Sequence, residues 1–327
     1  MQQYVSELYN TLVGAASECK ANYLSFSGGL DSTIIAYLLK EKIHGVSVIV
    51  SDHTAPDHTF IEIARDEFNI PVDIEYVNFE KLLPKIEEII KIFKNFNFIE
   101  IRNYVGLYNI CQIAKNNNQK GIITGDAADE LFAGYNFFLT KDFKEIDSNL
   151  KKIWKVMQFP SKKIAAHFGL DVDYPFLNEN VKKLAMEIPV ELKIKSERNR
   201  MYGKWILRKA FEGKISKTLL WRDKTPMGDG SGSAGLIAFF DKFYSDEDYS
   251  KKLQNVKKED DVTLYSKEQL YYYEIFRKHF DAPSKLNQSS TQCPDCKYEF
   301  NPDLPSYGTR RYGLEFCRMC GRFPYIK

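Results

Sequence analysis

The sequence predicts an α/β protein with a doubly wound parallel sheet, a mostly helical C-terminal half and a small cysteine-rich module at the end. Three observations lead to this fold class. Short apolar runs alternate with helical patterns in the first 124 residues, residues 137–280 are almost wholly helical in pattern, and two C-x-x-C pairs lie near the C-terminus. Alternating strands and helices form parallel sheets with right-handed crossovers.

The individual elements follow from apolar runs and periodicity. Strands are expected at 23–26, 46–50, 72–77 and 121–124. Helices are expected between them at 31–41, 57–68, 79–94 and 104–116. The domains are expected to be an N-terminal helix at 1–20, a main domain at 21–280, a polar linker at 281–292 and a metal ribbon at 293–327.

Composition limits the class of protein. The 327 residues are 44% hydrophobic, enough for a full core, and the net charge of +2 gives no global nucleic-acid signature. Met1-Gln2-Gln3 starts no apolar run, and no stretch reaches the roughly 18 apolar residues of a membrane span. Paired cysteines without a secretory leader indicate a reducing compartment, so we expect a cytoplasmic protein with no membrane partner.

The most informative segment follows the first strand. Its residues are Ser27, Gly28, Gly29, Leu30, Asp31 and Ser32, and an apolar helical pattern comes next. Glycines let backbone N–H groups approach a phosphate, and a helix N-terminus favours negative charge. The segment lacks the Lys-Ser/Thr ending of a Walker loop. It resembles the PP-loop of ATP pyrophosphatases, which cleave ATP between its α and β phosphates; the alternative is an ordinary glycine turn.

A second motif follows the strand at 121–124 and is acidic. It runs from Gly125 and Asp126 through Asp129 to Gly134-Tyr135. Carboxylates suit Mg²⁺, which keeps several waters and needs one or two of them. Together with the first motif, it resembles the synthetase domain of the asparagine synthetase family and its relatives.

The resemblance implies ATP, Mg²⁺ and a set of site residues. Asp31 and Asp129 would hold Mg²⁺. Asp126 replaces the family's usual Glu near the reacting adenylate, and Ala127 replaces a Gly. A helix cap is the alternative role for Asp126. The residues implied for nucleotide binding are Ser27, Gly28, Gly29, Asp31, Ser32, Gly125 and Asp129.

Three later segments extend the resemblance. Ile101-Arg102-Asn103 resembles a family segment whose Arg contacts pyrophosphate. The helix from Lys204 to Phe211 matches a Lys-Trp-x-Leu-Arg pattern, and the loop from Trp221 to Gly232 carries the residue that matches the catalytic lysine, Lys224. An ammonium there can neutralise charge on leaving pyrophosphate. The alternative for Lys224 is an ordinary surface charge.

Asparagine synthetases begin with a glutaminase domain, whereas about twenty residues precede the PP-loop here, too few for such a domain. The expected substrates are a small-molecule carboxylate and ammonia or an amine. Free ammonia or a separate glutaminase partner would supply the nitrogen.

The two C-x-x-C pairs predict a metal site. Cys293, Cys296, Cys317 and Cys320 have the spacing of a four-thiolate zinc ribbon, which leaves no open coordination position and is therefore structural. The remaining cysteines, Cys19 and Cys111, are expected to be buried, with thiol transfer as the alternative.

Basic and aromatic residues interleave in the ribbon, and this pattern could bind tRNA. We expect instead that the ribbon packs on its own enzyme. The residues concerned are Arg310, Arg311, Tyr312, Phe316, Arg318, Arg322, Phe323, Tyr325 and Lys327.

The leading hypothesis is therefore an ATP-dependent, AMP-forming carbon–nitrogen ligase. Two alternatives remain open at this point. One is a PP-loop enzyme that modifies tRNA, with the ribbon binding RNA. The other is a catalytically inactive nucleotide-binding module.

Overall fold

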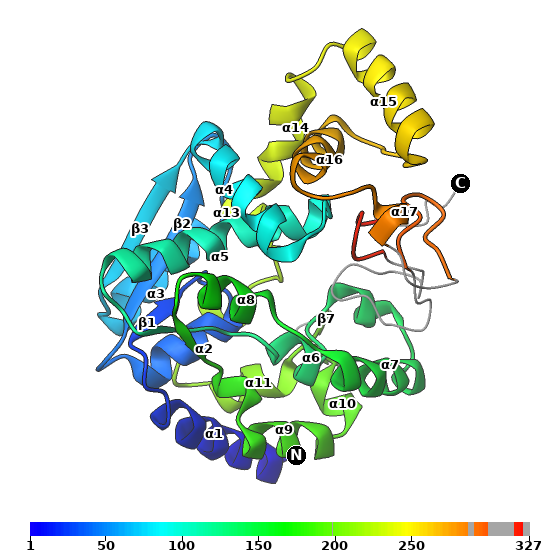
Figure 1. Cartoon of the computed structure of the whole chain (residues 1–327). Helices are drawn as coiled ribbons and strands as arrows, with labels where there is room; N and C mark the ends of the chain where they lie inside the picture. The colour runs from blue at the N-terminus through cyan, green and yellow to red at the C-terminus, as the bar shows by residue number, and fades with distance from the viewer. Residues whose placement is uncertain (198, 287–290, 300–316, 323–327) are drawn as a thin grey trace.

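The computed structural model describes residues 1–197, 199–286, 291–299 and 317–322. Its centre is a parallel sheet with the strand order β3-β2-β1-β4-β5 (Figure 1). The strands are β1 (Tyr23–Ser25), β2 (His44–Val50), β3 (Val72–Val77), β4 (Gly121–Ile123) and β5 (Asp171–Asp173). The prediction of a doubly wound α/β protein is confirmed.

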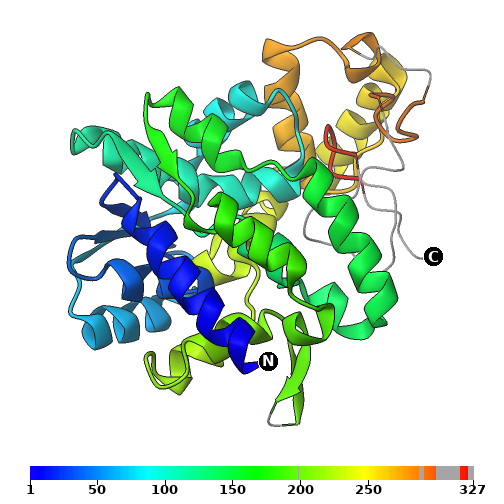
Figure 2. The same ribbon diagram turned by 90° about the horizontal axis from the view of Figure 1, so that it is seen from below.

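Helices cover both faces of this sheet, as the two views in Figures 1 and 2 show. One hydrophobic core contains side chains of α1, α2, α3 and α11 (Trp205–Ala210). A second core contains side chains of α4, α5, α8 (Pro160–His167) and α16 (Lys267–His279). The helices of the first half are α1 (Gln2–Ser17), α2 (Leu30–Leu39), α3 (Asp57–Phe68), α4 (Phe79–Phe93) and α5 (Phe98–Asn116). The helix predicted for the N-terminus is thus part of the main core.

The strand order places a topological switch point between β1 and β4. From β1 the chain moves outward through β2 to β3, and β4 then pairs with the other side of β1. Ligands of open α/β sheets bind at the carboxyl ends of the strands at such a point. The two sequence motifs follow the strands at this point. The glycine-rich loop that starts at Ser27 follows β1, and the acidic motif that starts at Gly125 follows β4.

The second half is helical, with two exceptions that the sequence pattern did not reveal. β5 adds an edge strand of three residues, and β6 (Lys195–Glu197) pairs with β7 (Arg200–Tyr202) in an antiparallel hairpin. The helices are α6 (Ala128–Phe132), α7 (Phe143–Val156), α8 (Pro160–His167), α9 (Glu179–Glu187), α10 (Val190–Lys193), α11 (Trp205–Ala210), α12 (Lys217–Leu220), α13 (Met227–Ser231), α14 (Leu236–Asp241), α15 (Asp246–Asp260), α16 (Lys267–His279) and α17 (Pro283–Leu286). Short 3₁₀ turns occur at η1 (Asn136–Thr140), η2 (Pro175–Leu177) and η3 (Ser233–Gly235).

Helix α5 begins six residues earlier than predicted. Asn97 caps it, because its side-chain oxygen accepts a hydrogen bond from the backbone N–H of Glu100 at 3.3 Å. Arg102 therefore lies inside the helix rather than before it. Among the described residues, no helix is long and apolar enough to cross a membrane.

Part of the predicted ribbon lies outside the described residues. This holds for Arg310, Arg311, Tyr312, Phe316, Phe323, Tyr325 and Lys327. Arg318 and Arg322 are described. The proposed division into a main domain, a linker and a ribbon stays a prediction.

Candidate active site

The loop after β1 has the local geometry of an anion cradle. Gly28 adopts a φ of +65°, and Gly29 caps α2. The hydroxyls of Ser27 and Ser32 lie 3.2 Å apart, and the backbone N–H of Gly29 donates to Ser27 Oγ at 3.2 Å. The loop therefore presents hydroxyls and backbone donors at the N-terminus of a ten-residue helix.

Gly28 is required by packing as well as by its backbone angle. A Cβ there would lie 2.8 Å from the backbone nitrogen of Ile61 in α3. Arg222 supports the same contact, since its Nη1 donates to Gly28 O at 2.6 Å and its Nη2 donates to Asp57 Oδ1 at 2.7 Å. Asp57, the first residue of α3, is thus an ion-pair partner of Arg222, and Pro56 occupies the cap position of this helix.

The second motif approaches the first closely. A Cβ on Gly125 would lie 2.9 Å from Asp31 Cβ, so only a glycine lets the β4 loop reach the first turn of α2. The turn that follows brings Asp129 to the same place.

Two lysines connect the acidic residues. Lys204 Nζ lies 2.5 Å from Asp31 Oδ2 and 2.7 Å from Asp129 Oδ1. Lys224 Nζ contacts Asp129 Oδ2. Burial alone would raise the pKa of Asp129, but the ammonium groups of Lys204 and Lys224 together hold this pKa well below its usual range. Burial likewise opposes the charge of Lys204, and the two carboxylates outweigh it and raise the pKa of Lys204.

Backbone strain concentrates around Asp129. Ala127, Ala133 and Lys204 all have positive φ, at 77°, 54° and 54°. Gly134 has no room for a side chain, since a Cβ would lie 2.0 Å from Asp129 Oδ1. Non-glycine residues in this region cost on the order of 1–2 kcal/mol each, and such strain clusters at functional sites.

The carboxylates fit the chemistry of a divalent cation. Within the described part of the chain, Asp31 Oδ1 is buried and has no hydrogen-bond partner. An oxygen atom of this kind, beside a second carboxylate, matches the donor set that Mg²⁺ prefers.

Asp126 lies on the β5 side of this cluster. Ser161 Oγ donates to its Oδ2 at 2.5 Å, Thr124 Oγ1 donates at 3.0 Å, and Tyr174 OH lies 2.9 Å from Ser161 Oγ. Burial, together with neighbouring carboxylates, raises the pKa of Asp126. Its partners are side chains, and Ala127 caps α6, so the helix-cap alternative for Asp126 is wrong.

Arg102 lies apart from the carboxylate network. Its Nε donates to Phe98 O and lies 3.3 Å from Glu268 Oε1 on α16. Its backbone carbonyl accepts a hydrogen bond from Ser233 Oγ at 2.9 Å, on the segment that follows Lys224.

Sequence reasoning missed the role of Lys204 and the Arg222–Asp57 pair. Lys204 was noted only as the first residue of a helix motif. Lys204 is only 3% exposed, and it pairs with Asp31 and Asp129. Both partners are far away in the sequence, so no local pattern distinguishes this lysine from one on the surface.

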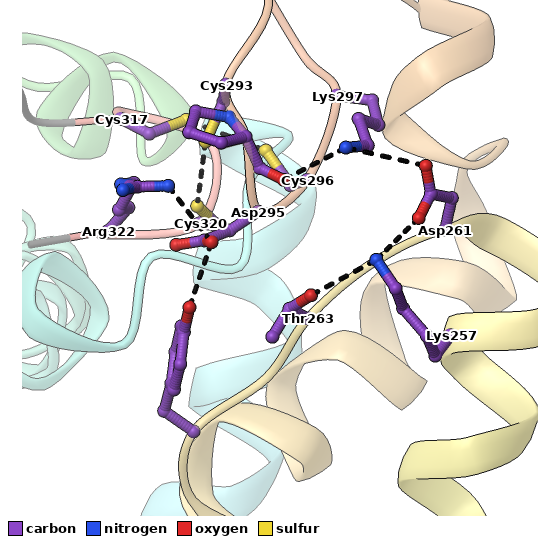
Figure 3. Close-up of polar contacts among 12 residues, drawn as sticks. Lys257, Asp261, Thr263, Cys293, Asp295, Cys296, Lys297, Cys317, Cys320 and Arg322 are labelled. Atoms are coloured by element: carbon purple, nitrogen blue, oxygen red, sulfur yellow. Dashed lines mark hydrogen bonds and ion pairs between the residues drawn. The ribbon is translucent and has the colours of Figure 1, made fainter. Parts of the chain in front are cut away.

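The four C-terminal cysteines form a separate cluster (Figure 3). Their sulfurs all lie within 4.8 Å of one another, with Cys293 to Cys320 at 3.8 Å and Cys296 to Cys317 at 3.6 Å. A tetrahedral Zn²⁺ with bonds of about 2.3 Å places its sulfurs about 3.8 Å apart, so the donor set fits zinc.

The cluster packs on the main domain. Tyr265 OH donates to the Asp295 carboxylate at 2.9 Å, and Thr263 N donates to the carbonyl of Asp295 at 2.8 Å. Within the cluster, Arg322 Nη1 donates to the same carboxylate at 3.0 Å (Figure 3). The four cysteines share a hydrophobic core with residues of α5 and α16.

Cys19 and Cys111 lack the character of sulfur-transfer residues. Burial raises the pKa of Cys19 to about 11 and that of Cys111 to about 12. Both thiols therefore stay protonated at neutral pH and are poor nucleophiles.

Comparisons with known proteins identify the family of this chain. The family described as asparagine synthase matches residues 23–159 and 144–299. The chain belongs to this family. A probable glutamine-hydrolyzing asparagine synthetase of Dictyostelium discoideum is 26% identical over 286 residues, which cover 76% of this chain and 50% of that protein. The human glutamine-hydrolyzing asparagine synthetase is 25% identical over 272 residues, with 78% and 48% covered.

The chain spans about half the length of the curated relatives it matches. Among solved structures, NMN synthetase from Francisella tularensis aligns with a TM-score of 0.39 and 14% identity, over 85% of this chain and 93% of that chain.

Proposed function

We propose that this member of the asparagine synthase family is an ATP-dependent ligase that forms an amide and releases AMP and pyrophosphate. The observation that carries the proposal is the network of Asp31, Lys204, Asp129 and Lys224 beside a glycine-rich helix N-terminus. ATP is the cosubstrate that such a loop accommodates.

The first step is attack of a substrate carboxylate on the α-phosphate of ATP, which forms an acyl-adenylate and releases pyrophosphate. Backbone N–H groups and the hydroxyls of Ser27 and Ser32 bind the phosphates. Asp31 and Asp129 would hold Mg²⁺, which neutralises phosphate charge when bound. Lys224, 31% exposed on its side chain, stabilises the negative charge that develops on the leaving group.

The second step is attack of ammonia or an amine on the adenylate carbonyl, with loss of AMP. Asp126 would accept a proton from this nucleophile, since its raised pKa makes it a better base than an ordinary aspartate. Arg102 would bind the pyrophosphate. The carboxylate is a small molecule, with aspartate as the first candidate, and the nitrogen comes from free ammonia or from a separate glutaminase.

Exchange of labelled pyrophosphate into ATP tests the first step. Lys224→Ala is expected to lower the exchange rate by at least 100-fold, because it removes a positive charge that stabilises the transition state. Its circular dichroism and unfolding midpoint should stay close to wild type. The exposed Lys217→Ala is the matched control. Exchange at the wild-type rate in Lys224→Ala would refute the assignment.

We also propose that Cys293, Cys296, Cys317 and Cys320 bind structural Zn²⁺. Support comes from the sulfur spacing and from burial of all four side chains. Tyr265 OH donates to Asp295 at 2.9 Å and Gln269 Nε2 donates to Cys320 O at 2.9 Å, and these contacts favour packing of the ribbon on the enzyme over contact with tRNA.

A further inference from the structure

We propose that the cysteine cluster positions Arg102, with Asn97 and Gln269 as the positioning residues that connect the two. The inference rests on the proposed function, because it assigns Arg102 to pyrophosphate. The segment 317–321, which supplies Cys317 and Cys320, is called the second knuckle below.

The first connection runs through the start of α5. The backbone N–H of Phe96 donates to Met319 O at 2.9 Å, and Asn97 Nδ2 donates to Arg318 O at 3.4 Å. Gly321 has a φ of +70°, and a Cβ there would lie 2.5 Å from Asn97 Oδ1. That same oxygen caps α5, so the second knuckle packs directly on the residue that fixes where the helix of Arg102 begins.

The second connection runs through α16. Gln269 is 1% exposed, and its Nε2 donates to Cys320 O at 2.9 Å. Its neighbour Glu268 is 2% exposed on its side chain and lies 3.3 Å from Arg102 Nε. One turn of α16 therefore contacts both the second knuckle and the arginine.

These connections end at the candidate active site. The Nε of Arg102 donates to Phe98 O at 3.3 Å and lies 3.3 Å from Glu268 Oε1, so α5 and α16 together orient its guanidinium. The carbonyl of Arg102 accepts from Ser233 Oγ, and a Cβ on Gly228 would lie 3.3 Å from Asn103 Oδ1. The start of α5 thus also contacts the segment that follows Lys224. A metal ion on the four thiolates would hold Cys320, and with it both connections.

The test is Gln269→Leu, which leaves every cysteine in place. Zinc content is measured first and is expected to equal wild type. The substitution removes two hydrogen bonds, the one from Nε2 to Cys320 O and the one that Oε1 accepts from Tyr265 N at 2.8 Å. In pyrophosphate–ATP exchange, the KM for pyrophosphate should rise about threefold to tenfold, the scale of such lost hydrogen bonds, while kcat changes less. Lys297→Gln removes a different contact of the cluster with the main domain, its 3.4 Å ion pair with Asp261, and should leave this KM unchanged.

A double-mutant cycle with Arg102→Ala decides between positioning and general destabilisation. If Gln269 acts through Arg102, then Gln269→Leu should add little to the KM of Arg102→Ala. Additive effects, or an unchanged KM in Gln269→Leu, would overturn the inference.

A further readout does not depend on turnover. Chelation of the metal should speed amide hydrogen exchange of residues 100–103 relative to the distant helix α2, and unchanged exchange would overturn the inference. If wild-type protein catalyses no pyrophosphate exchange at all, the proposed function fails, and the hydrogen-exchange result still decides whether the cluster orders the helix of Arg102.

Discussion

The ammonium groups of Lys204 and Lys224 keep the buried carboxylate of Asp129 charged in the candidate site. Lys204 is buried, and it contacts both carboxylates that would hold Mg²⁺. Removal of one partner from a buried ion pair leaves an uncompensated charge, which costs about 3–5 kcal/mol. The more exposed Lys224 contacts the other oxygen of the Asp129 carboxylate, Oδ2.

Lys204→Met is therefore expected to lower the free energy of unfolding by about 3 kcal/mol. Urea unfolding measures this change, with the exposed Lys217→Met as control. Added Mg²⁺ should recover part of the loss, because the two carboxylates then gain a cation. A variant as stable as wild type without Mg²⁺ would contradict this account of Lys204.

Glu130, next to Asp129, predicts a pH dependence. Burial raises its pKa to about 7, the charge of Asp129 adds to this, and Tyr135 OH opposes it by donating a hydrogen bond. The unfolded pKa is about 4.3. The folded state therefore holds the extra proton between these values, so this residue's contribution to stability falls as pH rises from about 4 to 7.

Glu130→Gln mimics the protonated form and should remove that dependence. Relative to wild type, the variant is expected to gain roughly 1–3 kcal/mol of unfolding free energy between pH 5 and pH 8. Urea unfolding at both pH values measures the difference. A variant whose advantage shrinks as pH rises would show the opposite sign and reject the assignment.

Among the structural elements, the turn before α6 has a strained backbone at Ala127. Ala127 stands where the family usually has glycine, and its φ is 77°. Ala127→Gly relieves about 1–2 kcal/mol of backbone strain and loses about 0.8 kcal/mol of buried methyl contact. The expected net result is a gain of up to about 1 kcal/mol.

Thermal unfolding measures this gain, with Ala128→Gly as control. Ala128 lies in α6 itself, and its replacement should destabilise the protein. A lower unfolding temperature for Ala127→Gly would mean that packing outweighs strain at this turn.

The elements show what sequence can and cannot predict. Four of the five sheet strands and the two acidic loops follow from apolar runs and glycine-rich turns. The edge strand β5, Asp-Val-Asp, has too few apolar residues to be distinguished from a loop. The start of α5 has a local signal that the prediction overlooked, since Asn97 caps the helix through the N–H of Glu100 three residues later. Lys204, in contrast, is identified only by its distant partners Asp31 and Asp129, which leave no local pattern.

For the whole molecule, the cysteine cluster joins the C-terminal segment to the core. A metal ion that binds the four cysteines of the folded protein adds its binding free energy to the stability of the fold, so metal loss should reduce global stability. Chelation is expected to lower the unfolding temperature by at least 5 °C, and added Zn²⁺ should restore it. Unfolding that is independent of chelator would argue against a bound metal ion.

We propose that residues at the switch point between β1 and β4 activate a carboxylate with ATP. The most direct measurement is pyrophosphate release from ATP and Mg²⁺ with ammonium, with aspartate, other small carboxylates and bulk tRNA tested separately. We predict release that depends on one small carboxylate and is lost in Lys224→Ala. Release that depends only on tRNA, or ATP binding with no release under any condition, would contradict it.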